Sequence, residues 1–204
     1  MILDFAKLSG GTITTPTILD SVVLTDKEVY PYRDGAYAKE VTYTRTFNSD
    51  VYNSLCLPCD LYYDDEMYEA ISIYRFDSFR LNGDRISSNP TIKFEKYDTI
   101  PAGTPLVIIP NSSDLTYTFH GDNRKGYVRL EPYAGKPNKN TKSQWNISCG
   151  VGTVKFYRIW ELTTRGDMEQ DIYYLTKDGK ISRGTKDTTS VNSYRWIFTY
   201  DGFA

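Results

Sequence analysis

Apolar and polar residues alternate between residues 41 and 47. Val41, Tyr43, Arg45 and Phe47 occupy the odd positions, and threonines occupy the even ones. A period of two sends successive side chains to opposite faces of a sheet, so that one set meets the core and the other lies on the outer face. The pattern therefore predicts a half-buried strand.

Short runs of strand-like composition recur along the chain, separated by clusters of Gly, Pro, Asn and Asp, and such spacing is typical of a sandwich or barrel. The predicted strands are residues 51–57, 71–76, 91–97, 105–109, 115–120, 126–130, 145–149, 154–162, 171–176, 180–183 and 194–200. Residues 64–70 favour one or two helical turns, because acidic residues stand near the N-terminal end. We predict an all-β fold, an antiparallel, jelly-roll-like β-sandwich with at most one or two short helical turns.

A hairpin signal lies between two of these predicted strands. The connecting residues are Lys177-Asp178-Gly179-Lys180. An Asp-Gly pair suits a type I′ turn, so the sequence predicts a hairpin with a two-residue loop.

Residues 1–20 differ from the rest of the chain. The segment from Leu8 to Thr17 is small, polar and turn-rich, and a segment of this kind frays unless it lies against something. We expect a docking arm over residues 1–20, which contacts another copy of the chain or other proteins of an assembly, and one β-sandwich domain over residues 21–204. The apolar side chains expected to make these contacts are Leu3, Phe5, Leu8 and Ile13.

Charge and hydropathy narrow the function classes. Lys and Arg number 24 and Asp and Glu 26, which gives a net charge of −2 without a basic stripe, whereas nucleic-acid binding normally requires one. The longest wholly apolar run, Leu106 to Ile109, is far shorter than the ~20 residues of a membrane helix. Met1 to Lys7 carries an acid where a secretion signal needs basic residues. We therefore expect neither nucleic-acid binding nor membrane insertion. We also expect that the chain is either used without signal-directed export or has had its secretion signal removed.

Cys56-Leu57-Pro58-Cys59 has the spacing of a thioredoxin-like redox motif. The motif follows a predicted strand and precedes several carboxylates, which would raise a thiol pKa, whereas a redox site needs it lowered. We interpret both cysteines as small buried hydrophobic residues at a strand end.

His120 is the single histidine of the chain. A Cys3His zinc site would have to combine it with Cys56, Cys59 and Cys149, but zinc ligands usually come in closely spaced pairs, and the second pair is scattered. A catalytic triad would also need His120, which we expect instead to be a surface residue beside a turn. The sequence therefore predicts no catalytic, metal-binding or cofactor-binding residues, and a protein that is not an enzyme.

Aromatic residues are the most direct candidates for ligand contact, in a chain that holds 18 tyrosines. Aromatic rings on strands or loops can stack against sugars, although such rings more often belong to a core. The candidate residues for contact with a glycan or a partner are Trp145, Trp160, Trp196 and Tyr133.

Three short sequence motifs carry a family resemblance. Tyr43-Thr44-Arg45-Thr46-Phe47 and Asn53-Ser54-Leu55-Cys56-Leu57-Pro58 are followed by Ala102-Gly103-Thr104-Pro105. They resemble the "TRTF", "WNTLCLPF" and "AGTPYLIKP" wording of a β-sandwich domain that recurs in surface and secreted proteins of Bacteroidetes. Tyr52, Cys59 and Leu106 depart from that wording, which has Trp, Phe and Tyr there. The resemblance implies architecture, with a tight turn at Gly103, and carries no catalytic residue.

The resemblance and the polar N-terminal arm together suggest a function. We expect a non-enzymatic virion protein of a phage that infects such bacteria, a fibre or capsid-decoration component that takes part in assembly and host-surface contact. Its expected partners are other virion proteins or further copies of itself, and a host glycan. The alternative is a secreted or surface-anchored bacterial adhesin or carbohydrate-binding module.

Overall fold

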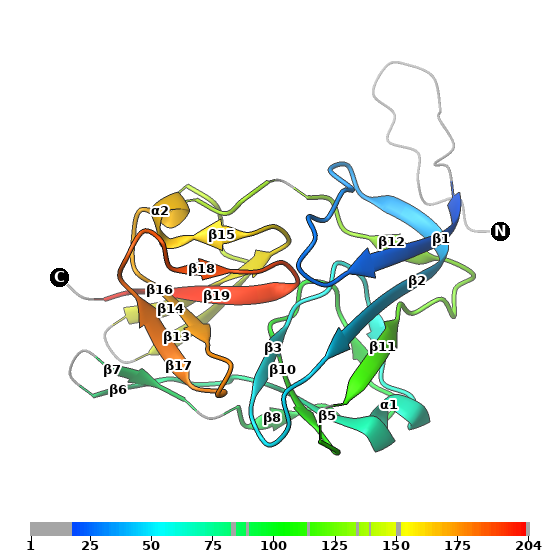
Figure 1. The fold of residues 1–204 in the computed structure, drawn as a ribbon, viewed down its shortest axis with the longest axis horizontal. Coiled ribbons are helices and arrows are strands. Elements are labelled where there is room, and N and C mark those ends of the chain that lie inside the picture. The colour runs from blue at the N-terminus through cyan, green and yellow to red at the C-terminus, as the bar shows by residue number, and fades with distance from the viewer. Residues whose placement is uncertain are drawn as a thin grey trace.

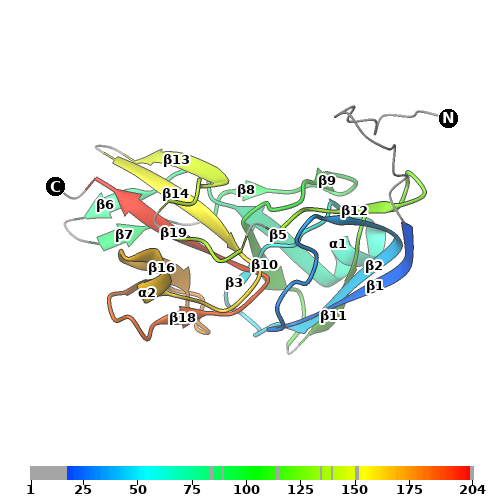
Figure 2. The same ribbon diagram turned by 90° about the horizontal axis from the view of Figure 1, so that it is seen from above.

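The computed structural model describes residues 18–82, 85–88, 90–113, 115–133, 135–138, 140–149 and 152–202. Within them, nineteen strands form six sheets, and two short helices complete the fold (Figure 1). The three larger sheets, here sheets I, II and III, follow one another along the long axis of the molecule (Figures 1 and 2). The predicted all-β, sandwich-like fold with short helices is confirmed.

Sheet I is built around its longest strand. It comprises β1 (Ile18–Thr25), β2 (Ala36–Thr46), β11 (Thr116–His120) and β12 (Val128–Leu130), with β1 parallel to β2 and the other two antiparallel to it. Val41, Tyr43 and Phe47 are buried, whereas the Thr44 and Thr118 hydroxyls lie 2.7 Å apart on the exposed face. The half-buried strand predicted from the alternation is confirmed.

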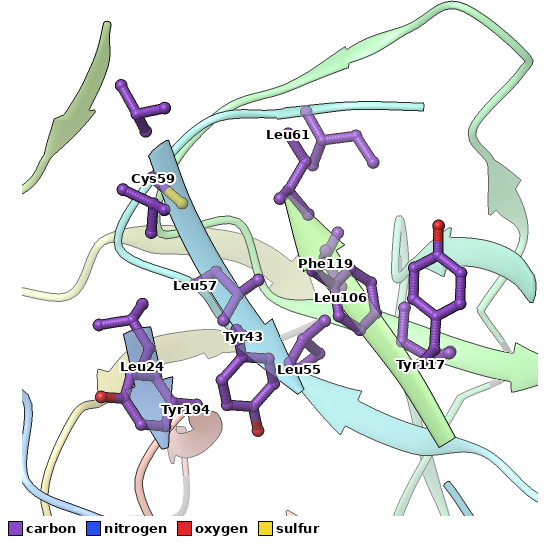
Figure 3. Close-up of a cluster of buried hydrophobic side chains, with 14 of the residues drawn as sticks. Leu24, Tyr43, Leu55, Leu57, Cys59, Leu61, Leu106, Tyr117, Phe119 and Tyr194 are labelled. Carbon is purple, nitrogen blue, oxygen red and sulfur yellow. The ribbon is translucent and has the colours of Figure 1, made fainter. Parts of the chain in front are cut away.

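Sheet II lies between the other two sheets, and its two inner strands contribute residues to the clusters on both sides. It comprises β3 (Asn53–Leu55), β10 (Leu106–Pro110), β5 (Ile71–Arg75) and β8 (Ile92–Lys93). Leu106 and Ile108 pack into the cluster shared with sheet I, part of which Figure 3 shows. Val107 packs into the cluster shared with sheet III. A strand buried on both faces reads as a continuous apolar run, which explains the apolar stretch from residue 106 to 109.

Sheet III closes the other end of the molecule. It comprises β13 (Trp145–Cys149), β14 (Gly152–Ile159), β19 (Arg195–Asp201), β16 (Ile172–Leu175) and β17 (Ile181–Gly184). Trp196 and Phe198 face sheet II, and Ile197 packs on the opposite side against Met168 of α2 (Arg165–Met168). The Trp196 Nε1–H group donates to the Leu106 carbonyl at 2.7 Å, which joins sheets II and III.

Three pairs of short strands and a second helix complete the fold. The paired short strands are β4 (Leu61–Tyr62) with β9 (Thr99–Ile100), β6 (Arg80–Asn82) with β7 (Arg85–Ser87), and β15 (Thr163–Thr164) with β18 (Ser190–Val191). Helix α1 (Asp65–Ala70) begins after Asp64, whose carboxylate accepts a hydrogen bond from the Met67 N–H at 2.9 Å. The predicted helical turns over 64–70 are therefore confirmed, with a side-chain cap at their start.

Two turn predictions have different outcomes. Gly103 has φ +74° and lies in a turn in which the Thr104 N–H donates to the Pro101 carbonyl at 3.3 Å, as expected. The β16–β17 hairpin also forms, but the predicted type I′ loop is wrong. In the described chain, Gly179 has a positive φ and Asp178 does not, and the Gly179 N–H donates to the Thr176 carbonyl at 3.0 Å. The loop is a three-residue turn that ends in a left-handed glycine.

The N-terminal part of sheet I was not predicted. Strand β1 pairs with β2 in parallel, with Ile18 opposite Tyr37 and Thr25 opposite Thr44. The expected boundary between residues 20 and 21 therefore falls inside a strand. Residues 1–17, which include all four predicted docking residues Leu3, Phe5, Leu8 and Ile13, lie outside the described residues. The predicted strand over 91–97 is reduced to β8, because a turn with Tyr97 at φ +73° follows it.

Candidate functional site

Two of the predicted contact residues are core residues. Trp160 is 1% exposed and Trp196 is 0% exposed. Trp160 packs edge-on against Tyr30 with ring centroids 4.9 Å apart, and Trp196 packs against Phe156 at 5.4 Å. The prediction that these two rings offer a stacking platform for glycans is corrected, because neither ring presents a face to solvent.

The other two predicted contact residues also lie within packed surroundings. Trp145 is half-buried, and the guanidinium of Arg75 covers its ring at 4.8 Å from the centroid. Tyr133 is buried beside Trp160, with ring centroids 6.3 Å apart. The four predicted aromatic residues therefore do not form one exposed surface.

The three cysteines are buried and free. Cys59 belongs to the cluster between sheets I and II, and Cys56 to the cluster between sheets II and III. Burial raises the pKa of both thiols to about 12. The interpretation of these residues as small hydrophobic core residues agrees with the structure, because a thiol with such a pKa is not a thiolate at neutral pH.

His120 ends β11 at the surface, as expected. Its Nδ1 lies 3.9 Å from a carboxylate oxygen of Glu40, and its side chain is 62% exposed. Cys149 lies in the core, where its thiol donates to the Phe79 carbonyl at 3.2 Å. Within the described residues, no group of three or more His, Cys, Asp or Glu side chains is arranged to hold a metal ion.

A polar cleft of about 390 Å³ opens where the three large sheets meet. The turn after β1, the end of β2 and the start of β3 form one side, and the β16–β17 loop, β18 and the start of β19 form the other. These elements converge in the middle of Figure 1. The residues that line it are Asp26, Lys27, Arg45, Thr46, Asn48, Asn53, Ser54, Tyr174, Leu175, Thr176, Lys177, Ser190, Val191, Asn192 and Arg195.

A carboxylate, a hydroxyl and a guanidinium are joined in one network along this cleft. Asp26 and Arg195 form an ion pair at 2.9 Å, with side chains 21% and 10% exposed. The Tyr43 hydroxyl donates to Asp26 at 2.6 Å and accepts from Arg195 at 3.2 Å. Burial opposes ionisation of Asp26, but Arg195, the Tyr43 hydroxyl and Arg45 outweigh it and hold the Asp26 pKa below its usual range.

A second guanidinium lies in the same cleft. Arg45 donates to the Ser54 carbonyl at 2.6 Å and lies over the Phe47 ring at 4.8 Å. Burial, and after it the like charge of Arg195, lowers the pKa of the Arg45 guanidinium to about 10. It is therefore still cationic at neutral pH, so the cleft holds two guanidinium groups, that of Arg195 buried and that of Arg45 half-buried, near the one Asp26 carboxylate.

The backbone is strained beside the charged network. Lys27, next to Asp26, has φ +70°, and Tyr194, next to Arg195, has φ +57°. Residues other than glycine rarely adopt this left-handed region, and such strain is concentrated at functional sites. The two strained residues flank the Asp26–Arg195 ion pair from opposite ends of the chain.

The sequence held one signal of this site. Arg45 occupies an inward position in the alternating pattern of β2, between Tyr43 and Phe47. A charged residue at a position that the pattern assigns to the core needs a partner or a role. Asp26 and Arg195 gave no such signal, because only the folded chain brings together residues that are 169 positions apart.

The comparisons with known proteins give no family assignment. No protein-family model, no curated protein and no solved structure matches this chain. Among the described residues, no helix combines the length and apolar character needed to cross a membrane.

Proposed function

We propose that this chain is a non-enzymatic structural and binding module of a bacteriophage particle, a fibre or capsid-decoration component that also contacts the host surface. The proposal starts from the resemblance of its Tyr43–Phe47, Asn53–Pro58 and Ala102–Pro105 phrases to a domain of Bacteroidetes surface proteins. A phage that infects such bacteria has access to modules of this kind.

The observation that carries the binding part of the proposal is the cleft between the sheets. Its charged groups already bond to one another, with Tyr43, Asp26 and Arg195 linked by hydrogen bonds and an ion pair. A network of this kind is preorganised to hold a ligand in place. The described residues around the cleft therefore favour recognition as its role.

The edge of sheet I supports the assembly part of the proposal. Strand β1 is the edge strand among the described strands of that sheet, and it exposes two apolar side chains, Ile18 at 48% and Val23 at 74%. Val29, in the loop that follows, is 57% exposed. An exposed strand edge with apolar side chains favours pairing with another chain.

Mass spectrometry of gradient-purified phage particles tests this proposal. The proposal predicts a fixed ratio of this chain to the major capsid protein, and the ratio separates a capsid decoration from a rarer fibre. If the chain is absent from particles and present in the host envelope fraction, the virion assignment is overturned. The second candidate, a secreted or surface-anchored bacterial adhesin, would then apply, and the same cleft supports its binding role.

A further inference from the structure

The described side chains that line the cleft carry an excess of positive charge. Four of them are basic, Lys27, Arg45, Lys177 and Arg195, and Asp26 is the one acid. At the base of the cleft Arg195 is buried and Arg45 is half-buried, whereas Lys27 and Lys177 are exposed. A cleft lined by one sign of charge concentrates ions of the opposite sign.

The charge at the base is not balanced within the cleft itself. The Asp26 carboxylate forms an ion pair with Arg195 at 2.9 Å and accepts a hydrogen bond from the Tyr43 hydroxyl. Arg45 donates instead to a neutral carbonyl, that of Ser54. A buried charge without a full counter-charge is costly, and a bound anion would remove that cost. The depressed pKa of Arg45 agrees with this imbalance, because burial and the neighbouring Arg195 both disfavour its charge.

The remaining lining indicates what accompanies the anionic group. Hydroxyl and amide side chains dominate it, and apolar side chains are few. The polar members that reach solvent are Thr46, Asn48, Thr176, Ser190 and Asn192. Asn53 and Ser54 are buried, and the Asn53 amide group already donates to backbone carbonyls. Amides and hydroxyls both donate and accept hydrogen bonds, which suits a ligand with several hydroxyl groups. A volume of about 390 Å³ lies within the usual range for small-ligand pockets, roughly 300–1,000 Å³.

We infer that this cleft binds an acidic sugar, with the carboxylate of the sugar on the Arg45 guanidinium group and its hydroxyls on the amide and hydroxyl side chains of the rim. The Arg195 guanidinium already donates to Asp26, the Tyr43 hydroxyl and the Ser193 and Tyr194 carbonyls, so it adds its positive charge beside that carboxylate. A planar guanidinium donates two parallel hydrogen bonds to a carboxylate, which makes arginine the suitable residue for this group. Lys27 and Lys177 attract the anion at the entrance. This inference rests on the host-contact part of the proposed function. It places the glycan contact in the cleft and not on the four aromatic residues predicted from the sequence.

Isothermal titration calorimetry on the full chain tests the ligand class. The probes are glucuronate, a glucuronate-containing oligosaccharide, glucose, acetate and inorganic phosphate, each at the same ionic strength. We expect the two uronates to bind at least tenfold more tightly than glucose, acetate or phosphate, because only they combine a carboxylate with ring hydroxyls. Tighter binding of the oligosaccharide than of the free acid would identify a glycan as the natural source. Equal binding of acetate or phosphate, or of glucose, would overturn the inference.

Matched variants test the location. Arg45→Lys keeps the charge but loses the planar donor pair, and should weaken glucuronate binding by about tenfold. Lys177→Gln removes an exposed charge at the rim and should weaken it several-fold without affecting folding. Lys125→Gln makes the same charge change at an exposed position outside the cleft and should leave affinity unchanged. Because Lys177 and Lys125 are both exposed, the inference remains testable even if the Arg45 variant does not fold.

The outcomes for the inference and for the proposed function are separable. A fixed ratio of the chain in purified particles, together with no uronate binding, would refute the inference and leave the virion role intact. Uronate binding that is equal in wild type, Lys177→Gln and Arg45→Lys would place the ligand elsewhere and also refute the inference.

Discussion

Replacement of Asp26 by asparagine should destabilise this protein, because Asp26 is the carboxylate of a largely buried ion pair. Asn keeps the shape of the side chain but leaves Arg195 and Arg45 without a counter-charge in the cleft. Breaking a buried ion pair by removing one partner costs ~3–5 kcal/mol. Because the Asp26 side chain is still 21% exposed, we expect the free energy of unfolding to fall by about 3 kcal/mol, the lower end of that range. For a domain of this size such a loss corresponds to a fall in Tm of roughly 6–12 °C.

The pH dependence of the loss provides an independent check. The pKa of Asp26 in the folded state lies below its usual value, so the unfolded chain takes up the proton first as the pH falls. The stabilisation from Asp26 is therefore present above the ordinary carboxyl pKa of about 3.9 and is lost as the pH falls through the folded-state pKa. The difference in unfolding free energy between wild type and Asp26→Asn should be constant from about pH 5 to 8 and should shrink below about pH 4.

Urea unfolding at several pH values measures this difference, and Asp20→Asn is the matched control. Asp20 also pairs with a cation, Lys39 at 2.6 Å, but the two side chains are 89% and 66% exposed. Exposed pairs of this kind contribute little to stability, so the control should unfold like wild type at pH 7. If Asp26→Asn were as stable as Asp20→Asn at pH 7, or if its deficit were unchanged at pH 3, the assignment of a buried charge network would be refuted.

Three further predictions concern the network, the hairpin and the thiols. Tyr43→Phe removes the hydroxyl between Asp26 and Arg195 and should lower the free energy of unfolding by about 1.5–3 kcal/mol, as measured by urea unfolding. An unchanged unfolding midpoint would contradict the network. Gly179→Ala should lower Tm, because Gly179 has φ +68° and an added Cβ would lie 2.5 Å from the Tyr52 backbone nitrogen. Gly126→Ala is the control, because Gly126 also has a positive φ but has open space around it, so its Tm should fall less. All three cysteine thiols should resist a thiol reagent until the chain unfolds, because they are buried, and rapid labelling of the native protein would restore the redox interpretation.

The alternating and continuous apolar patterns predict the individual strands well, because burial on one or both faces of a sheet determines them directly. The pattern of β2 and the apolar run of β10 are examples. The pairing of β1 with β2 could not be predicted in the same way. The two strands are parallel, so no hairpin turn can join them. The Asp34-Gly35 pair before β2 resembles a hairpin signal, but it lies in a turn in which the Gly35 N–H donates to the Tyr32 carbonyl at 3.3 Å.

The candidate site was the least predictable part of the chain. Large aromatic rings such as Trp160 and Trp196 suit sugar binding, but the same apolar area also favours their burial between the sheets. The cleft depends on the order of the sheets, which brings Asp26, Arg45 and Arg195 together from three separate segments. Of these residues, only Arg45 stands out in the sequence, as a charge at an inward position of an alternating strand.

The most direct test of the account is an NMR titration that observes the arginine side chains themselves. The Nε–Hε resonances of Arg45 and Arg195 report on the two guanidinium groups at the base of the cleft. Both resonances should shift progressively on addition of glucuronate and remain unchanged on addition of glucose. If glucuronate left both unchanged, or shifted only resonances of residues outside the cleft, then the junction of the three sheets would not be the binding site for an acidic sugar.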